Sequence, residues 1–174
     1  MALEEQKPRH IEHFKHDSMY FWSMKVLMVC LGNICRSPMA DGLLRKKVSD
    51  LGLNVEVDSA GTSGFHQGAA PDARMRATAR SFGCPIDNLR SRQFLISDFD
   101  EFDRIYVMDQ SNMRNVLNLA RDENDTEKVM LILNESNPNM NLEVPDPYYG
   151  GDRGFIDVYN MLDEATDRII EGIS

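Results

Sequence analysis

The chain has 174 residues, which is enough for one full hydrophobic core and too few for two ordinary domains. Its net charge of -9 repels the nucleic-acid backbone and argues against a nucleic-acid partner. Its three cysteines do not fit a secreted disulfide framework, and it shows neither a signal-like start nor an apolar run of roughly 20 residues, so we expect a cytoplasmic protein with no membrane contact.

Residues 1–23 are polar and irregular, and we expect them to form a flexible extension ahead of a single domain over residues 24–174. Within this extension His10, His13 and His16 recur at three-residue intervals, a spacing that on a helix would bring two imidazoles near one metal ion. A solvated tail is the simpler interpretation. No thiolate or carboxylate is placed to complete a metal site, so we predict no metal ion there, and we expect the protein to use no cofactor.

The first structural unit is predicted to be a strand, a turn and a helix. Residues 25–30 are β-branched and apolar, which is typical of a buried strand that ends at Cys30. Ser37 is a suitable N-cap for the following helix, and Pro38 suits its first position. Gly52 ends this helix, in which apolar residues recur at helical spacing at Leu43, Leu44, Val48 and Leu51.

Strands and helices alternate along the rest of the chain. Further strands are predicted at residues 53–58, 103–108 and 127–133, and loops at residues 59–64 and 134–151. Further helices are predicted after the cap residue Asp72, at residues 110–120 and at residues 152–170. Their expected core residues are Met75, Ala79 and Phe82 in the first of these helices and Phe155, Val158, Leu162 and Ile169 in the last. The alternation predicts a three-layer α/β fold, a four-stranded parallel sheet with helices on both faces, whose ligand site lies beyond the carboxyl ends of the strands.

The segment Cys30-Leu-Gly-Asn-Ile-Cys-Arg-Ser37 joins the first strand to the first helix. Its backbone N–H groups can turn inward as a nest, and the helix adds about half a positive charge at the same end, so the segment is suited to hold a phosphate. Arg36 supplies forked donors that match two phosphate oxygens. The residues of this predicted phosphate-binding loop are Leu31, Gly32, Asn33, Ile34, Cys35 and Arg36.

Cys30 lies at the base of this loop, where the helix end and the guanidinium favour its thiolate form. A thiolate below the phosphorus can attack in line and carry the phosphoryl group as a covalent intermediate. Ser37 can donate to the departing sulfur, Gly32 permits the unusual backbone angles of the turn, and the Asn33 side chain can brace the loop. An inert buried thiol is the commoner fate of a cysteine alone, but the residues around Cys30 favour a nucleophile.

The run Val29-Cys-Leu-Gly-Asn-Ile-Cys-Arg-Ser-Pro38 resembles the signature of low-molecular-weight protein tyrosine phosphatases. The resemblance spans about residues 25–173 and continues in Asp58-Ser-Ala-Gly-Thr, Pro71-Asp72, Arg92-Gln93, Met108-Asp-Gln-Ser-Asn112 and Asp146-Pro-Tyr-Tyr-Gly150. It implies a four-stranded parallel sheet with flanking helices, phosphotyrosine-containing protein substrates and a phosphocysteine mechanism without metal. It also implies that Cys30 is the nucleophile, that Arg36 binds the phosphate and that Asp146 is the acid.

The second half of the expected site lies around Asp146, in the long loop after the fourth strand. Asp-Pro alone commonly begins a turn, and only the family resemblance indicates that Asp146 belongs to the active site. Tyr148 and Tyr149 can wall a cleft for a phenyl phosphate, and Phe65 stands where the family usually presents a tryptophan. His66 follows, either as a substrate contact or as a solvated loop residue.

The sequence also departs from the family at one position, where a side chain usually supports the phosphate-binding loop. Vertebrate members carry a histidine just before the Arg92-Gln93 pair that helps to brace the loop, and Leu89 stands there in this chain. The resemblance therefore supplies no bracing residue for that position.

Related activities remain as alternatives. Thioredoxin-coupled arsenate reductases share the fold but relay a disulfide through two more cysteines that lie close together, and only Cys84 is available in that region. Protein-arginine phosphatases carry threonine where Ile34 stands, which favours phosphotyrosine. A non-catalytic phosphotyrosine-binding module would not need Asp146. We therefore expect a phosphatase that hydrolyses phosphotyrosine and small aryl phosphates.

Cys35 follows Cys30 by five residues, on a loop that curls around the same anion. Packing beneath the loop is its simplest role. The curl also predicts that mild peroxide joins Cys30 and Cys35 in a reversible disulfide, which would protect the nucleophile from irreversible oxidation.

Overall fold

The computed structural model describes residues 23–173 of the chain. The predicted extension, with His10, His13 and His16, lies outside these described residues except for Ser23. Within the described part, no helix is both long enough and apolar enough to cross a lipid bilayer.

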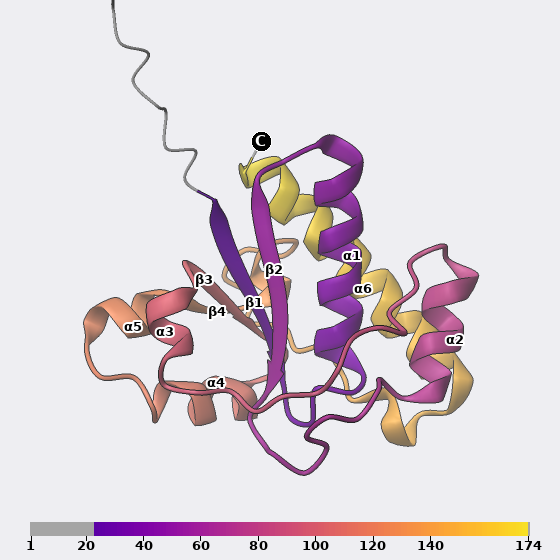
Figure 1. Cartoon of the computed structure of the whole chain (residues 1–174), viewed down its shortest axis with the longest axis horizontal. Helices are drawn as coiled ribbons and strands as arrows, with labels where there is room; N and C mark the ends of the chain where they lie inside the picture. Colours follow the sequence, from indigo (N-terminus) through magenta and orange to yellow (C-terminus); the bar gives the residue numbers. More distant parts are fainter. Residues whose placement is uncertain (1–22, 174) are drawn as a thin grey trace, which may run out of the picture.

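Four parallel strands form one sheet at the centre of the protein (Figure 1). In chain order they are β1 (Met24–Cys30), β2 (Val55–Gly61), β3 (Arg104–Val107) and β4 (Val129–Leu131). Their order across the sheet is β2-β1-β3-β4, so β1 lies between β2 and β3 and is buried over its last five residues. The register pairs Cys30 with Gly61, and Val29 with Val107. All four strands therefore end at the same edge of the sheet, as predicted for a parallel α/β fold.

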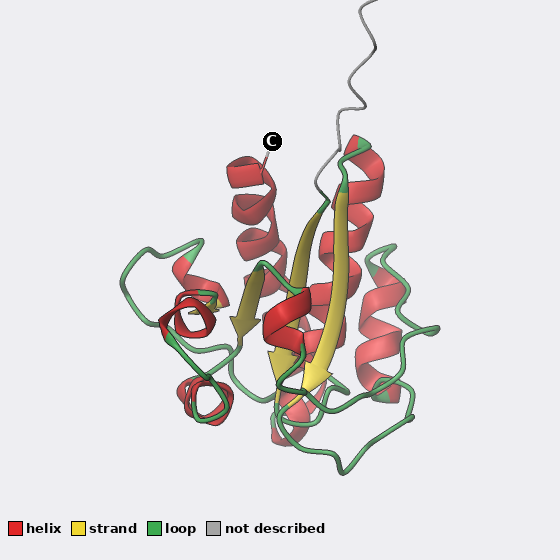
Figure 2. Cartoon of the chain, turned by 60° about the vertical axis from the view of Figure 1, so that its left-hand side comes forward, coloured by secondary structure: helices red, strands yellow, loops and turns green. Residues whose placement is uncertain are grey.

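Six helices cover the sheet. They are α1 (Arg36–Leu51), α2 (Ala73–Ser81), α3 (Asp98–Glu101), α4 (Gln110–Leu117), α5 (Glu123–Glu127) and α6 (Gly151–Ile173), with two short 3₁₀ helices, η1 (Ile132–Asn134) and η2 (Pro147–Tyr149), among the described residues. Helices α1 and α6 lie on one side of the strands, with α2 against α6, and α3, α4 and α5 lie on the other side (Figures 1 and 2). The three predicted layers are present.

Alternation along β1 divides the hydrophobic core in two. Val26 and Met28 belong to the cluster beneath α1 and α6, whereas Leu27 and Val29 belong to the cluster that contains Phe99 of α3. Successive side chains of a strand point to opposite faces, and both faces of this strand are covered, so its sequence is apolar without interruption. The predicted core residues of the last helix are all buried, and they are Phe155, Val158, Leu162 and Ile169.

Helix α1 differs from its prediction at its first turn and in the burial of Leu51. Its N-cap position is Cys35, and Ser37 lies inside the first turn, fully buried, with its hydroxyl directed at Cys30 rather than at the helix backbone. Gly52 ends the helix in the left-handed conformation, as predicted. Leu51 is 59% exposed, because it lies in the last turn beside the exposed Gly52.

The second strand begins and ends later than predicted. Ser59, Ala60 and Gly61 were assigned to a loop from their composition, but they pair in register with the last three residues of β1. Small side chains suit this position because the phosphate-binding loop packs against it. A Cβ on Gly61 would lie 2.8 Å from the carbonyl oxygen of Leu31.

Three other predictions need correction. Phe82 is not a core residue of α2 but is 42% exposed and stacks on Tyr159, with the ring centroids 3.8 Å apart. The predicted helix at residues 110–120 ends at Leu117, and the predicted strand at residues 127–133 is only three residues long, because the chain turns into η1 at Ile132. The sequence also gave no indication of the short helices α3 and α5.

Candidate active site

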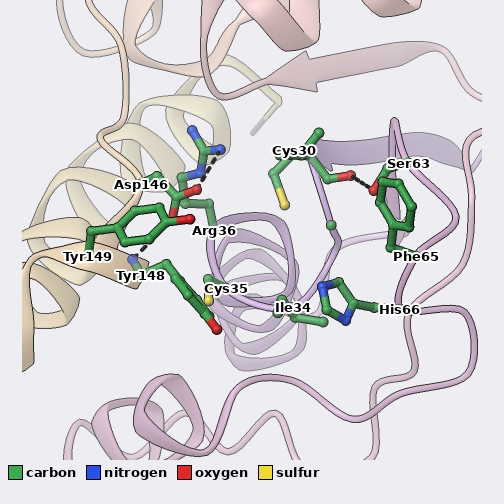
Figure 3. Close-up of a pocket in the computed structure, with 12 residues that line it drawn as sticks. Cys30, Ile34, Cys35, Arg36, Ser63, Phe65, His66, Asp146, Tyr148 and Tyr149 are labelled. Atoms are coloured by element: carbon green, nitrogen blue, oxygen red, sulfur yellow. Dashed lines mark hydrogen bonds and ion pairs between the residues drawn. The ribbon is translucent and has the colours of Figure 1, made fainter.

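The loop between β1 and α1 lies at the edge of the sheet where the strands end, and it forms the floor of a cavity of about 270 Å³ (Figure 3). The unusual backbone angle expected at Gly32 occurs one residue later, at Asn33, whose φ is 53° and which tolerates this left-handed conformation. Gly32 instead lies close to a side chain, since a Cβ there would be 3.0 Å from Cδ2 of the exposed His66.

The sulfur of Cys30 has two hydrogen-bond partners. The backbone N–H of Asn33 donates to it at 3.3 Å, and the hydroxyl oxygen of Ser37 lies 3.1 Å away. The Asn33 side chain donates to that hydroxyl at 2.8 Å, which leaves the Ser37 proton to point at the sulfur or, at 3.4 Å, at the carbonyl of Ala60. The N–H of Asn33 and the Ser37 hydroxyl therefore both lie within hydrogen-bond distance of the sulfur.

Arg36 is buried, with 4% of its side chain exposed, beside the same cavity. Its NH1 donates to Oδ2 of Asp109 at 2.7 Å and to the carbonyl of Val144 at 2.9 Å, and its NH2 lies 3.8 Å from Oδ2 of Asp146. Burial alone lowers the pKa of Arg36, but the negative charges of Cys30, Asp109 and Asp146 outweigh it and hold that pKa above its ordinary value. The cation is therefore kept charged and fixed in orientation.

Two residues of this arrangement had no predicted role. Asp109 caps α4 by accepting from the N–H of Asn112 at 2.7 Å, and its other oxygen holds Arg36. Its place directly after the third strand and before a helix, at the same sheet edge as Cys30, is the signal that could have identified it. Ser91 donates to the carbonyl of Gly32 at 3.0 Å.

Ser91 lies in the segment where the sequence indicated no brace. The neighbouring N–H of Arg92 donates to Oδ1 of Asn33 at 3.0 Å, and its carbonyl accepts from the N–H of Gly61 at 2.8 Å. The phosphate-binding loop is thus braced by the hydroxyl of Ser91 and the backbone amide of Arg92.

Asp146 is brought to the mouth of the cavity by η2. Its Oδ1 accepts from the N–H of Tyr148 at 3.0 Å, which caps this short helix, and 42% of its side chain is exposed. Tyr148 and Tyr149 lie on this side of the cavity, in edge contact with ring centroids 5.1 Å apart. Phe65 lies on the opposite side with His66 (Figure 3). Phe65 and Tyr149 are 91% and 90% exposed, so they form an open apolar rim.

Most of the predicted site residues line the same cavity, and the two supporting residues, Asn33 and Ser37, do not. The cavity lining includes Cys30, Cys35, Arg36, Phe65, Asp146, Tyr148 and Tyr149. Asn33 and Ser37 lie beneath it. Cys84 lines a different cavity, beside Lys46 of α1. Over residues 23–173, no three His, Cys, Asp or Glu side chains are grouped so that they could hold a metal ion.

A tight loop between a strand end and a helix amino terminus, with a buried cysteine and a buried arginine beside one cavity, is suited to bind a phosphate group. A sequence model of the family described as low molecular weight phosphotyrosine protein phosphatase matches residues 25–174, and the chain belongs to this family. It is 39% identical to the low molecular weight phosphotyrosine protein phosphatase of Schizosaccharomyces pombe, covering 87% of this chain and 98% of that protein. It is 40% identical to the human protein of that name, covering 84% and 93%.

Solved structures agree with this assignment. A protein tyrosine phosphatase from Entamoeba histolytica, with Hepes in its active site, superposes with a TM-score of 0.80 at 40% identity, covering 86% of this chain and 96% of that one. YfkJ from Bacillus subtilis superposes with a TM-score of 0.81 at 34% identity, covering 87% and 95%. The chain is thus a phosphatase of the low molecular weight protein tyrosine class.

Proposed function

We propose that this phosphatase removes phosphate from tyrosine side chains of proteins, and from small aryl phosphates, through a phosphocysteine on Cys30. The observation that carries the proposal is that the Cys30 sulfur, the Arg36 guanidinium and the Asp146 carboxyl line one cavity at the amino end of α1. They supply a nucleophile, a cation for the phosphoryl oxygens and a proton donor, with no metal ion needed.

In the first step the phosphoryl group binds in the loop formed by Leu31 to Arg36, with its oxygens held by backbone N–H groups and by the Arg36 fork. The Cys30 thiolate attacks phosphorus, and the bond to the tyrosine oxygen breaks. Asp146 gives that oxygen its proton, so tyrosine leaves as a neutral phenol. The N–H of Asn33 and the hydroxyl of Ser37 lie close enough to the sulfur to hold it in position.

In the second step water attacks the phosphorus of the phosphocysteine. Asp146, now ionised, takes a proton from this water, and the sulfur leaves as a thiolate. Ser37 lies 3.1 Å from that sulfur and donates to it as its negative charge returns. Inorganic phosphate then leaves the loop, and Cys30 and Asp146 are back in their starting forms.

The rim of the cavity supports an aryl group as the substrate. The exposed rings of Phe65 and Tyr149 stand on opposite sides of the cavity, which Tyr148 and the apolar Ile34 also line, so a phenyl ring can lie between aromatic walls while its phosphate reaches Cys30. A Drosophila arginine phosphatase superposes on the chain with a TM-score of 0.79 at 33% identity. The fold alone therefore does not select the substrate, which makes the rim the deciding feature.

The test compares the rates on peptides that contain phosphotyrosine, phosphoserine or phosphoarginine, and on arsenate with thioredoxin. We expect phosphotyrosine to be hydrolysed fastest, with a phosphorylated Cys30 detected by mass spectrometry after a rapid acid quench. Cys30→Ser should still bind phosphate but not turn over, whereas the matched variant Cys84→Ser, at a buried thiol outside the site, should keep its activity. Faster cleavage of phosphoarginine, or activity that survives in Cys30→Ser, would refute the proposal.

A further inference from the structure

Arg74, the second residue of α2, lies between the two halves of the site without lining the cavity. Its side chain is 41% exposed, yet each of its three guanidinium nitrogens has a hydrogen-bond acceptor. Its side chain contacts Asp72, the turn that carries Asp146, and α6, and Asp72 is in turn bonded to the phosphate-binding loop.

Toward the phosphate-binding loop, Arg74 acts through Asp72. Its Nε and NH2 donate to the two carboxylate oxygens of Asp72 at 3.1 and 3.0 Å, a forked pair that only arginine can make. The backbone N–H of Asp72 in turn donates to the carbonyl of Ile34 at 2.8 Å. The hydrogen bonds from Arg74 hold the pKa of Asp72 below its ordinary value, so this carboxylate stays ionised. Arg74 is therefore fixed relative to the loop that holds the phosphate.

Toward the acid, Arg74 reaches the turn that follows Asp146. Its NH1 points at the carbonyl of Tyr148 at 3.4 Å, and its guanidinium carbon lies 5.2 Å from the centre of the Tyr148 ring. The same guanidinium lies 4.7 Å from the ring of Phe155, which is fully buried in α6. A cation between two aromatic rings and a carbonyl holds this turn from one side.

We propose that Arg74 is a positioning residue that sets the distance between Asp146 and the phosphate-binding loop, through Asp72 on one side and Tyr148 on the other. The inference rests on the proposed function for its catalytic consequence. The turn itself is short, and its internal hydrogen bonds, from the N–H of Tyr148 to Asp146 and from Gly150 to Pro147, do not link it to the loop. The approach of Arg36 NH2 to Oδ2 of Asp146, at 3.8 Å, is longer than a hydrogen bond. Proton transfer to the leaving oxygen depends on such placement, and a misplacement of about 1 Å costs roughly 100-fold in rate.

The experiment replaces Arg74 with methionine, which keeps a long apolar stem against Phe155 but removes the fork and the charge. The expected loss in kcat/KM is about 10- to 100-fold for a phosphotyrosine peptide, and less than about threefold for p-nitrophenyl phosphate, whose leaving group departs without a proton. The inhibition constant of inorganic phosphate should stay within about twofold, since the loop is intact. Arg80→Met is the control, because Arg80 lies on the same helix and its side chain pairs, within residues 23–173, only with Asp87.

Measuring Arg74→Met in the Asp146→Asn variant shows whether Arg74 acts through Asp146. Asp146→Asn keeps the oxygen that accepts from Tyr148 but cannot give a proton, so adding Arg74→Met to it should cost less than about twofold in kcat/KM on the peptide. An equal loss in both backgrounds, a weakened phosphate inhibition, or a peptide rate in Arg74→Met within about twofold of the wild type overturns the proposal.

Hydrogen exchange gives a measurement that does not depend on activity. The amides of Tyr148 and Gly150 should exchange faster in Arg74→Met than in the wild type or in Arg80→Met. Unchanged exchange there would contradict the positioning role even in an active enzyme. A wild-type protein that does not cleave phosphotyrosine would refute the proposed function, and faster exchange would still support Arg74 as the contact that holds the turn.

Discussion

Replacing Asp109 with asparagine tests whether the orientation of Arg36 is set from outside the phosphate-binding loop. Oδ1 of Asp109 accepts from the N–H of Asn112 at 2.7 Å, and Oδ2 accepts from Arg36 at 2.7 Å. Asparagine can keep the first bond only by turning its amide nitrogen toward Arg36, so that one donor faces another. The carbonyl of Val144 is then the remaining acceptor for NH1.

The size of the effect follows from the bond that is lost. A hydrogen bond to a charged group contributes about 1.5–3 kcal/mol, which corresponds to roughly 10- to 100-fold in kcat/KM if it is needed to hold the guanidinium against the phosphoryl oxygens. Because every substrate presents the same phosphoryl group, phosphotyrosine and p-nitrophenyl phosphate should lose activity by similar factors.

Steady-state kinetics on both substrates, with thermal unfolding to confirm the fold, provide the assay. Asp122→Asn is the matched control, since Asp122 caps α5 through the N–H of Asp125 at 3.0 Å but has no contact with Arg36 among its hydrogen bonds. If Asp109→Asn stays within about twofold of the wild type, or slows phosphotyrosine alone, then Asp109 serves only as a helix cap and the reasoning is wrong.

Four further results are expected at the same site. Asp146→Asn should slow single-turnover cleavage of phosphotyrosine, whose leaving group has a pKa of about 10, by roughly 100- to 10,000-fold, and an activated aryl phosphate much less; equal slowing would mean that the carboxyl only positions the loop. Ser37→Ala should slow hydrolysis of the phosphocysteine more than its formation, so that a burst of phenol release is seen in stopped flow; the absence of a burst together with an unchanged rate would exclude its role toward the sulfur. Mild peroxide should oxidise Cys30 to a sulfenic acid, which Cys35 then attacks with loss of water to give a disulfide that dithiothreitol reverses; mass spectrometry that finds only irreversibly oxidised Cys30 beside a free Cys35 would rule this out. Burial raises the pKa of Cys84 to about 11, so iodoacetamide at neutral pH should label Cys30 and reach Cys84 only as the pH rises toward that value, which peptide mapping can follow.

The phosphate-binding loop could be predicted because its chemistry lies within one short stretch of chain. Cys30, Arg36 and the hydroxyl of Ser37 are neighbours in sequence, and the strand before them and the helix after them are marked by local patterns. The helix caps at Asp72 and Gly52 could be predicted for the same reason. Asp72 accepts a hydrogen bond from a free N–H of the first turn, and Gly52 adopts the left-handed conformation that ends a helix.

Residues far apart in sequence could not be paired in this way. Asp109 is 73 residues from Arg36, and Val144 is 108 residues from it, so their contacts depend on how β3 and the long loop lie against β1. The brace from Ser91 to Gly32 spans 59 residues and has no local signature. Phe82 belongs by spacing to the core stripe of α2, yet it stacks on Tyr159 at the surface because α6 passes beside it.

The sequence by itself determined that this protein has a cysteine-and-arginine loop between a strand and a helix, within a parallel α/β fold, because hydrophobic periodicity and turn chemistry are properties of neighbouring residues. Only the tertiary structure decided that Asp109 orients Arg36, that Ser91 braces the loop, that residues 59–61 complete β2, and that Arg74 lies between the two halves of the site. Those outcomes depend on which strand ends meet at one edge of the sheet and on which side chains are buried there, and both are set by contacts between distant parts of the chain.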